Sequence, residues 1–244
     1  MTLLKYIQQL SLLLRCSFIP NKCPVCNKIK AFDDQSVVCE KCLDKLKSVS
    51  NNSCLKCGAG VDRCKCKKHH VEYDGLVAPF YYEDIAIKIV SLFKYRYMTF
   101  FASFFAKEMA KKVKVKYENI TFDYIAYIPF SSMQKRKRNY NQSELLAEEL
   151  SKILNIPQSP LIIKLYNNKS QHYMKNQNRK GNVAGVYQID VSVDLTGKKI
   201  LLVDDIKTTG ATLNECAREL KLYGAEEVYC VTALITNKKK KSKQ

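Results

Sequence analysis

The residues with the clearest chemical potential lie in the segment 199–212, which reads KILLVDDIKTTGAT. An apolar run predicts a buried strand, and it leads through two adjacent carboxylates, Asp204 and Asp205, into small and hydroxyl-bearing residues and a predicted helix. Ligands of parallel sheets bind at the carboxyl ends of the strands, and the N–H groups of such a loop attract anions. We therefore expect a phosphate to be held by Lys207, Thr208, Thr209, Gly210, Ala211 and Thr212.

The two carboxylates impose a second demand on the ligand. They suit hydroxyl groups, a metal ion or a developing positive charge, so a ligand with both a 5′-phosphate and ribose hydroxyls satisfies both ends of the segment. A P-loop is excluded, because no Gly-Lys-Thr/Ser follows four residues after a first glycine. The competing interpretation is a polar strand end that binds nothing, and the particular order of small, hydroxyl and glycine residues argues against it.

Eight of the eleven cysteines lie between Cys23 and Cys66. They form three C-x2-C pairs and one C-x-C pair, and each C-x2-C turn points two sulfur atoms at one tetrahedral metal ion. Sequential pairing predicts two zinc sites, with Cys23, Cys26, Cys39 and Cys42 in the first and Cys54, Cys57, Cys64 and Cys66 in the second. A crossed pairing also fits the spacing. A disulfide framework of a secreted protein is the alternative, and no secretion signal supports it.

Four thiolates around Zn2+ form a closed shell, so these ions would be structural and not catalytic. One or two ions are expected, because C-x-C is an unusual half-site and His69 or His70 could replace a ligand. Zinc would supply the folding free energy that the few apolar residues of this segment cannot. Outside the cluster, Cys216 and Cys230 are expected to be small core residues.

The composition is that of a globular protein. Hydrophobic residues make up 46% of the 244 residues and charged residues 26%, and no stretch of about 18 apolar residues predicts a membrane-spanning helix. The formal net charge of +18 favours polyanionic partners, either nucleic acid or anionic lipid, although a lysine-rich composition can also reflect genome bias. A cytoplasmic location is expected.

Four regions are predicted: an N-terminal helix over 1–19, a zinc ribbon module over 20–70, an α/β domain over 71–236 and a basic, disordered tail over 237–244. Periodicity in the third region predicts strands at 75–82 (one or a pair), 124–128, 161–165, 186–189, 199–203 and 228–235. It also predicts helices at 84–105, 143–154 and 212–223. This alternation indicates a mostly parallel sheet with helices on both faces.

Residues 201–212 (LLVDDIKTTGAT) closely resemble the motif that binds phosphoribosyl pyrophosphate (PRPP) in type I phosphoribosyltransferases. Residues 15–236 resemble the ComF/ComFC family of competence-associated proteins, which join an amino-terminal zinc ribbon to a phosphoribosyltransferase domain. Further points of resemblance are the segments 92–96 (LFKYR), 140–142 (YNQ) and 179–183 (RKGNV), and Gln171. The chain departs from the family before Asn141, where Tyr140 stands and the usual glycine is missing.

The resemblance implies a type I phosphoribosyltransferase fold that binds PRPP with Mg2+. Asp204 and Asp205 would be the catalytic residues, because they would hold the ribose hydroxyls and favour an oxocarbenium-like transition state. The loop from Lys207 to Thr212 would anchor the 5′-phosphate. Mg2+ would bridge pyrophosphate and ribose oxygens with few protein ligands. Candidates for contacting the departing pyrophosphate are Phe130, Ser131, Arg138 and Arg179.

Two functions remain open at this point. The first is an enzyme that transfers phosphoribosyl from PRPP to an unidentified acceptor, with release of pyrophosphate, in a competence pathway. The second is a non-catalytic, PRPP-sensing protein that binds single-stranded DNA, with DNA-uptake or helicase proteins as further partners. The zinc module, the basic run 135–138 and the lysine-rich tail would contact DNA, together with stacking aromatics. These are Tyr95, Tyr97, Phe100 and Phe101, of which at least two are expected in the core.

Overall fold

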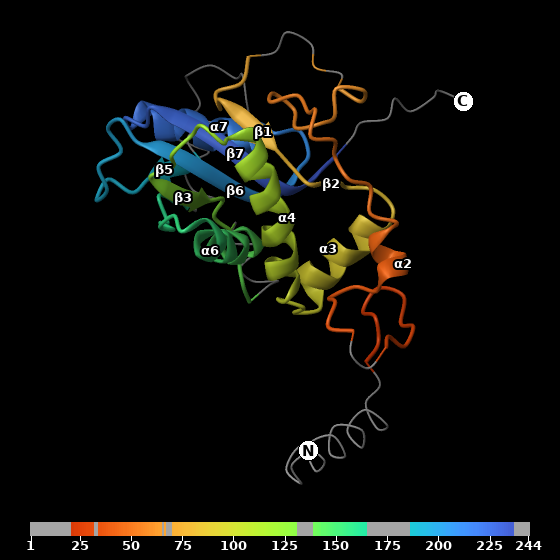
Figure 1. Ribbon diagram of the computed structural model, residues 1–244. Coiled ribbons are helices and arrows are strands. Elements are labelled where there is room, and N and C mark those ends of the chain that lie inside the picture. The colour runs from red at the N-terminus through yellow and green to blue at the C-terminus, as the bar shows by residue number, and fades with distance from the viewer. Residues whose placement is uncertain are drawn as a thin grey trace, which may run out of the picture.

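A five-stranded parallel sheet forms the centre of the computed structural model (Figure 1), which describes residues 21–31, 34–64, 66, 70–130, 139–164 and 186–236. The strand order is β1-β7-β6-β3, and β2 also pairs with β7. The five strands are β1 (Gly75–Val77), β2 (Phe80–Tyr81), β3 (Tyr124–Tyr127), β6 (Lys199–Lys207) and β7 (Glu227–Ile235). The predicted helix 1–19 and the tail 237–244 lie outside the described residues.

The central strand β6 is longer than the sequence predicted. The prediction ended that strand at Val203, which is wrong: β6 continues to Lys207, and Asp204 pairs with Thr232 of β7. The extension is possible because β7 stays apolar and buried up to Ile235, so it offers a ladder partner for the added residues. Both aspartates are therefore held in a regular strand.

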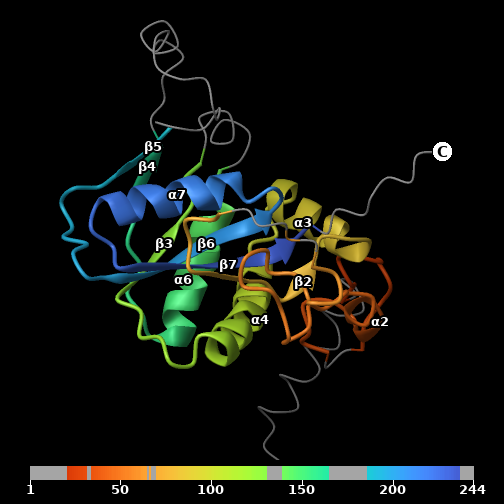
Figure 2. The same ribbon diagram turned by 90° about the horizontal axis from the view of Figure 1, so that it is seen from above.

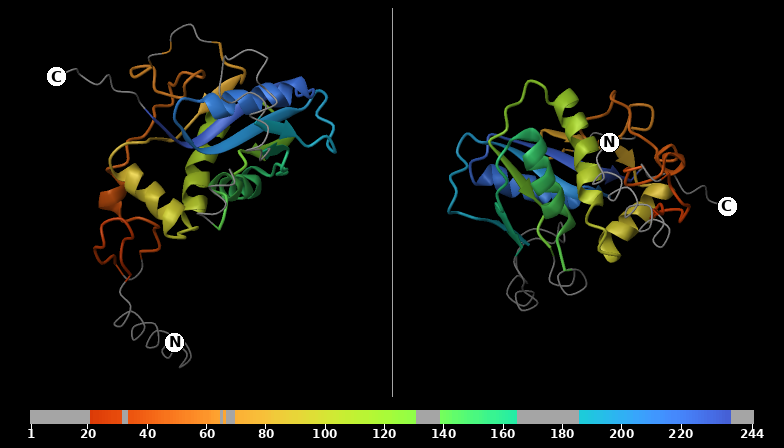
Figure 3. Two further views of the ribbon diagram at one scale, coloured as in Figure 1. Left: turned by 180° about the vertical axis from the view of Figure 1, so that it is seen from behind. Right: turned by 60° about the horizontal axis from the view of Figure 1, so that its bottom comes forward.

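Helices cover both faces of the sheet, as the alternation predicted (Figure 2). One face carries α3 (Ile85–Tyr95), α4 (Phe101–Lys116) and α6 (Gln142–Leu154), which Figure 3 shows from below. The other face carries α7 (Ala211–Leu222). Successive residues of β6 alternate between the two cores: Leu201 packs with the first set of helices and Leu202 with α7. Cys216 and Cys230 are fully buried in the α7 core, as predicted.

The helix predicted over 84–105 is in fact two helices. The first ends at Tyr95, Tyr97 has a left-handed φ of 54°, and α4 starts at Phe101 and continues to Lys116. A left-handed residue with a large side chain interrupts helical hydrogen bonding. The short helix α2 (Glu40–Leu43) was not predicted.

The remaining predicted strands are present. The two short runs at 161–165 and 186–189 form an antiparallel pair, β4 (Ile162–Lys164) and β5 (Tyr187–Ile189). The run at 75–82 forms two strands, β1 and β2, separated by Ala78 and Pro79, and each of them pairs with β7. No helix among the described residues has the length and apolar content needed to cross a membrane.

The cysteine-rich segment packs tightly on the α/β domain. Its residues Cys23, Val25, Val38, Cys42 and Leu46 belong to the core formed by α3, α4 and α6. Main-chain hydrogen bonds join the two parts: Val49 N–H donates to Pro79 O at 2.7 Å and Leu76 N–H donates to Leu55 O at 2.7 Å. The small apolar content of the segment is thus supplemented by a shared core. The boundary at residue 70 stays a prediction.

Phe105 provides a test of this core, because its fully buried ring packs against Phe93, Phe101 and Phe104. Phe105→Ala should lower the free energy of unfolding by about 3–5 kcal/mol, since it removes a large buried side chain and leaves a cavity. Phe100→Ala is the control: this ring is 46% exposed and the cost should be below about 1 kcal/mol. Urea denaturation measures both, and equal losses would contradict the described packing.

Candidate functional site

The loop between β6 and α7 forms a small polar hollow at the carboxyl end of the sheet. Its volume is about 30 Å3. The N–H of Asn214 donates to Gly210 O at 2.9 Å, and Thr209 Oγ1 accepts from Ala211 N–H at 3.3 Å. The structure thus brings Asp204 together with every loop residue that the sequence singled out, and the lining residues are Asp204, Ile206, Lys207, Thr208, Thr209, Gly210, Ala211, Thr212 and Leu213.

Gly210 is required by the geometry of this loop. Its φ is +85°, a conformation that residues with a side chain rarely adopt, and a Cβ atom there would lie 3.2 Å from Lys207 Cε. The Lys207 side chain therefore lies against Gly210. Its amine donates a hydrogen bond to the carbonyl of Cys57 at 3.3 Å. The carbonyl holds the amine near the hollow but carries no charge, so it does not neutralise the lysine.

The two aspartates have different partners. Asp204 Oδ1 accepts hydrogen bonds from Ser143 Oγ at 2.9 Å and from the N–H of Asp205 at 2.8 Å. Asp205 Oδ2 lies 2.5 Å from Lys94 Nζ, in an ion pair whose side chains are 16% and 15% exposed respectively. Burial, followed by the charge of Asp205, raises the pKa of Asp204 to about 7. The site therefore holds one carboxylate that is neutralised by a lysine and one that titrates near neutral pH.

The segment that begins α6 positions both partners of the aspartates. Asn141 Oδ1 accepts from the N–H of Ser143 at 3.1 Å as the helix cap, and Asn141 Nδ2 donates to Ile128 O, just past β3, at 3.0 Å. The hydroxyl of Tyr140 donates to the carbonyl of Phe93, the residue before Lys94. The residues 140–143 thus connect the end of β3 and the last turn of α3 to the acidic pair.

Sequence reasoning missed these two partners. The sequence indicates Lys94 only within the segment 92–96, as a point of resemblance, and Ser143 only as the start of a predicted helix. Both contacts bridge segments far apart in the chain, so no local spacing indicates them. A cation and a hydroxyl were nevertheless to be expected near two adjacent, partly buried carboxylates, which are costly without partners.

The remaining site candidates are only partly described. Phe130 lines a larger cavity of about 610 Å3 at the end of β3, together with Tyr127, Tyr140, Glu144 and Lys164. Within that cavity, Tyr127 Oη donates to Glu144 Oε1 at 3.1 Å. The candidates Ser131, Arg138 and Arg179 lie outside the described residues.

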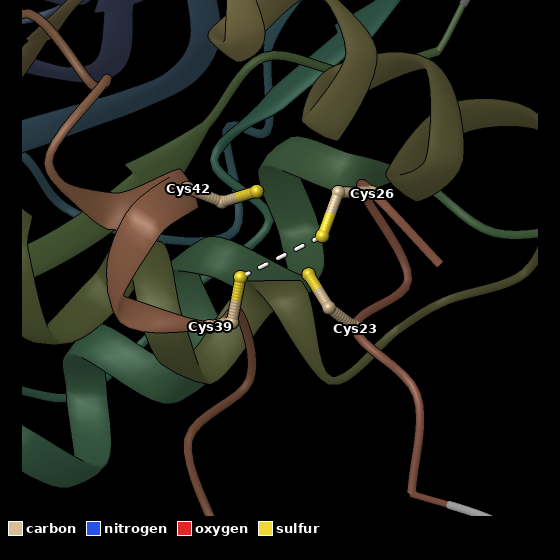
Figure 4. Close-up of side chains that lie close together, drawn as sticks. All are labelled: Cys23, Cys26, Cys39 and Cys42. Carbon is tan, nitrogen blue, oxygen red and sulfur yellow. Dashed lines mark hydrogen bonds between the residues drawn. The ribbon is translucent and has the colours of Figure 1, made fainter. Parts of the chain in front are cut away.

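The eight clustered cysteines gather in two groups of four that follow sequential pairing. In each group the four sulfur atoms lie within 4.8 Å of one another. Figure 4 shows Cys23, Cys26, Cys39 and Cys42 with their sulfurs directed to a common centre. Among the described residues, His70 belongs to neither group and instead pairs with Glu72. His69 lies outside the described residues.

The sulfur distances fit zinc. A tetrahedral ion with Zn–S bonds of about 2.3 Å requires S···S distances of about 3.8 Å. The Cys26–Cys39 distance is 3.7 Å in the first group, and the Cys57–Cys64 and Cys54–Cys66 distances are 3.7 and 3.9 Å in the second. All ten cysteines of the described residues are free of disulfides. Each group could hold one zinc ion in a closed thiolate shell.

Comparison with known proteins gives a family match over more than half of the chain. The family described as the phosphoribosyl transferase domain matches residues 102–244, which include β6, the loop and α7. Competence protein F of Haemophilus influenzae is 26% identical over 201 residues, covering 78% of this chain and 87% of that protein. Competence protein ComFC of Bacillus subtilis is 28% identical over 191 residues, covering 74% and 76%.

A third relative matches a shorter part of the chain. DNA utilization protein YhgH of Escherichia coli is 30% identical over 112 residues, covering 45% of this chain and 48% of that protein. The match spans about half of that relative's length.

The raised pKa of Asp204 predicts a pH dependence of stability. The folded state holds this proton more tightly than the unfolded chain, so stability falls as pH rises through about 7. Asp204→Asn cannot ionise and should gain about 2 kcal/mol relative to wild type between pH 5.5 and 8.5. Urea denaturation at both pH values measures the difference.

Asp190→Asn is the matched control, because hydrogen bonds from Ser192 lower the pKa of this exposed carboxyl. Its stability relative to wild type should not change over the same pH range. If Asp204→Asn and wild type vary in parallel with pH, Asp204 does not titrate near neutrality.

Proposed function

The chain belongs to the phosphoribosyl transferase domain family and, by its relatives, to the ComF group, and on this basis we propose that it binds PRPP with Mg2+. We further propose that it transfers the phosphoribosyl group to an acceptor and releases pyrophosphate. The observation that carries the proposal is the polar hollow of about 30 Å3 that Asp204 and residues 207–213 line together. One end offers donors for a phosphate, and the other offers a carboxylate for hydroxyl groups.

The phosphate end of the site rests on main-chain donors. The 5′-phosphate would bind N–H groups at the start of α7, a 12-residue helix whose N-terminus carries a partial positive charge. The threonine hydroxyls of the loop add donors, and the Lys207 side chain, which lies against Gly210, adds a positive charge. The N–H of Ala211 donates to Thr209 Oγ1 at 3.3 Å, so the phosphate would take the place of that hydroxyl.

The acidic end would act on the sugar. Ionised Asp204 would accept hydrogen bonds from the ribose hydroxyls and favour the positive charge that develops on the ring as the C1–O bond to pyrophosphate breaks. The pyrophosphate leaves with the electron pair, and the acceptor forms the new bond to C1. Lys94 holds Asp205 in place and sets a positive charge at the edge where the anionic leaving group departs.

Asp204 and Asp205 would help to hold Mg2+, which would neutralise part of the negative charge of the pyrophosphate. The carboxylate oxygens of Asp204 and Asp205 suit this ion, which needs few protein ligands and keeps most of its waters. Phe130, Ser131, Arg138 and Arg179 stay proposed contacts of the pyrophosphate.

The names of the relatives support a proposal for the cellular role. Because they are named for competence and DNA utilization, we propose that this chain acts in DNA uptake in the cytoplasm, with DNA-uptake or helicase proteins as partners. The two cysteine groups would each hold a structural zinc ion, giving two per chain.

A second candidate function is binding of single-stranded DNA, with PRPP as a sensed ligand only. The observation that favours it is the exposure of Tyr95, Tyr97 and Phe100, at 57%, 57% and 46%, in and around the break between α3 and α4. Bases stack on such rings. Phe101 is fully buried and belongs to the core. The expectation that at least two of the four aromatic candidates lie in the core is therefore wrong, and three remain for this role.

PRPP with Mg2+ should raise the melting temperature by about 5–10 °C at a concentration near 100 times Kd. Asp204→Asn combined with Asp205→Asn should abolish this shift, while Asp190→Asn should retain it. The proposal fails if wild type shows no shift. Pyrophosphate release should then be screened across nucleobases, small amines and DNA ends; a shift without release from any of them would favour the sensing function.

Tyr97→Ala combined with Phe100→Ala should weaken binding of a single-stranded oligonucleotide about 10-fold or more, because each lost stacking interaction costs about 1–3 kcal/mol. Tyr223→Ala is the control, since this ring is 44% exposed at the far end of α7. Fluorescence anisotropy at ~50 and ~200 mM salt measures affinity, which should fall with salt if phosphates are contacted. Equal losses in both variants would exclude the aromatic surface as the binding site.

A further inference from the structure

The second cysteine group (Cys54, Cys57, Cys64 and Cys66) lies directly against the start of the loop between β6 and α7, residues 208–210, the phosphate loop. Two hydrogen bonds end on main-chain carbonyls of its C-x2-C turn: the amine of Lys207 donates to Cys57 O at 3.3 Å, and the hydroxyl of Tyr73 donates to Lys56 O at 2.6 Å. Lys207 is the last residue of β6, immediately before the loop, and Tyr73 is buried beside it. The C-x2-C turn that would bind a zinc ion therefore also accepts hydrogen bonds from Lys207 and Tyr73.

Gly210 connects these contacts to the ligand hollow. A Cβ atom on Gly210 would lie 3.2 Å from Lys207 Cε and 3.7 Å from Tyr73 Oη, so both side chains lie against the residue at which the loop turns into α7. Cys57, Lys207 and Gly210 thus form one line of contacts from the cysteine group to the hollow. Close packing transmits a displacement at one end to the other.

The chain that follows the second group adds an independent contact. The N–H of Glu72 donates to Asn214 Oδ1 in the first turn of α7 at 2.7 Å. The group is anchored from the other side as well, since Leu76 N–H donates to Leu55 O and Gly58 packs against Leu76 and Ile235. The first group differs: its Cys23 and Cys42 lie in the core under α3 and α4.

We infer that the second cysteine group, when it holds its metal ion, positions the phosphate loop through Lys207 and Tyr73, so that metal occupancy and sugar-phosphate affinity are coupled. This inference rests on the proposed function. Without metal, this group of four thiols has little core of its own to fix its shape, and the carbonyls of Lys56 and Cys57 no longer hold their donors. By linkage, a sugar phosphate that binds the loop must in turn strengthen metal binding at this group.

The test uses the zinc-loaded full chain and ribose 5-phosphate as the probe. Saturating probe should slow the release of one zinc ion to a chromogenic chelator by threefold or more and leave the other unchanged. Cys66→Ser should lose one zinc ion and bind the probe at least tenfold more weakly by calorimetry. Cys26→Ser should also lose one ion but keep its affinity within about twofold, since the first group does not contact the loop.

Two further variants keep the test decisive if a cysteine variant does not fold. Tyr73→Phe and Lys207→Met should both retain two zinc ions, bind ribose 5-phosphate more weakly and lose the slowing of zinc release; Lys207→Arg should restore it in part. The coupling is refuted if wild type binds the probe but Cys66→Ser binds it equally well, or if the probe never affects zinc release. If zinc-loaded wild type binds neither ribose 5-phosphate nor PRPP, the proposed function fails and the coupling with it.

Discussion

Two adjacent carboxylates, Asp204 and Asp205, in the carboxyl-terminal half of β6 are the constraint on which this site depends. Their charges repel, and burial makes each costly unless it is paired or hydrogen-bonded. Lys94 supplies the counter-charge to Asp205, and Ser143 supplies a hydrogen bond to Asp204. The last turn of α3 and the first turn of α6 must therefore meet at the end of β6, and Tyr140 and Asn141 hold them there.

The same strand carries the other half of the site. Because β7 supports β6 as far as Lys207, the loop that follows starts from a fixed point and turns into α7 within three residues. The donors at that turn and the carboxylate of Asp204 then face one hollow, so in the proposed function one short segment would hold both a phosphate and a sugar. The second cysteine group supports the turn from behind, so the cysteine-rich segment belongs to the architecture of the site.

Much of this arrangement could be predicted from the sequence, because it follows from local patterns. Apolar runs located β3 and β7, and the order of residues 204–212 predicted a shared ligand site at the sheet edge. Cysteine spacing predicted the two groups. The break at Tyr97, the extension of β6 and the partners Lys94 and Ser143 could not be predicted, because they depend on contacts between distant segments. The roles of Ser131, Arg138 and Arg179 stay predictions.

A crystal structure grown with PRPP and Mg2+ tests the central claim most directly. The account predicts that the 5′-phosphate lies on the N–H groups of residues 208–212 and that the ribose hydroxyls lie within hydrogen-bond distance of Asp204. It would be contradicted by a ligand bound elsewhere while this loop is empty, or by an Asp204 that stays bonded to Ser143 and does not contact the sugar.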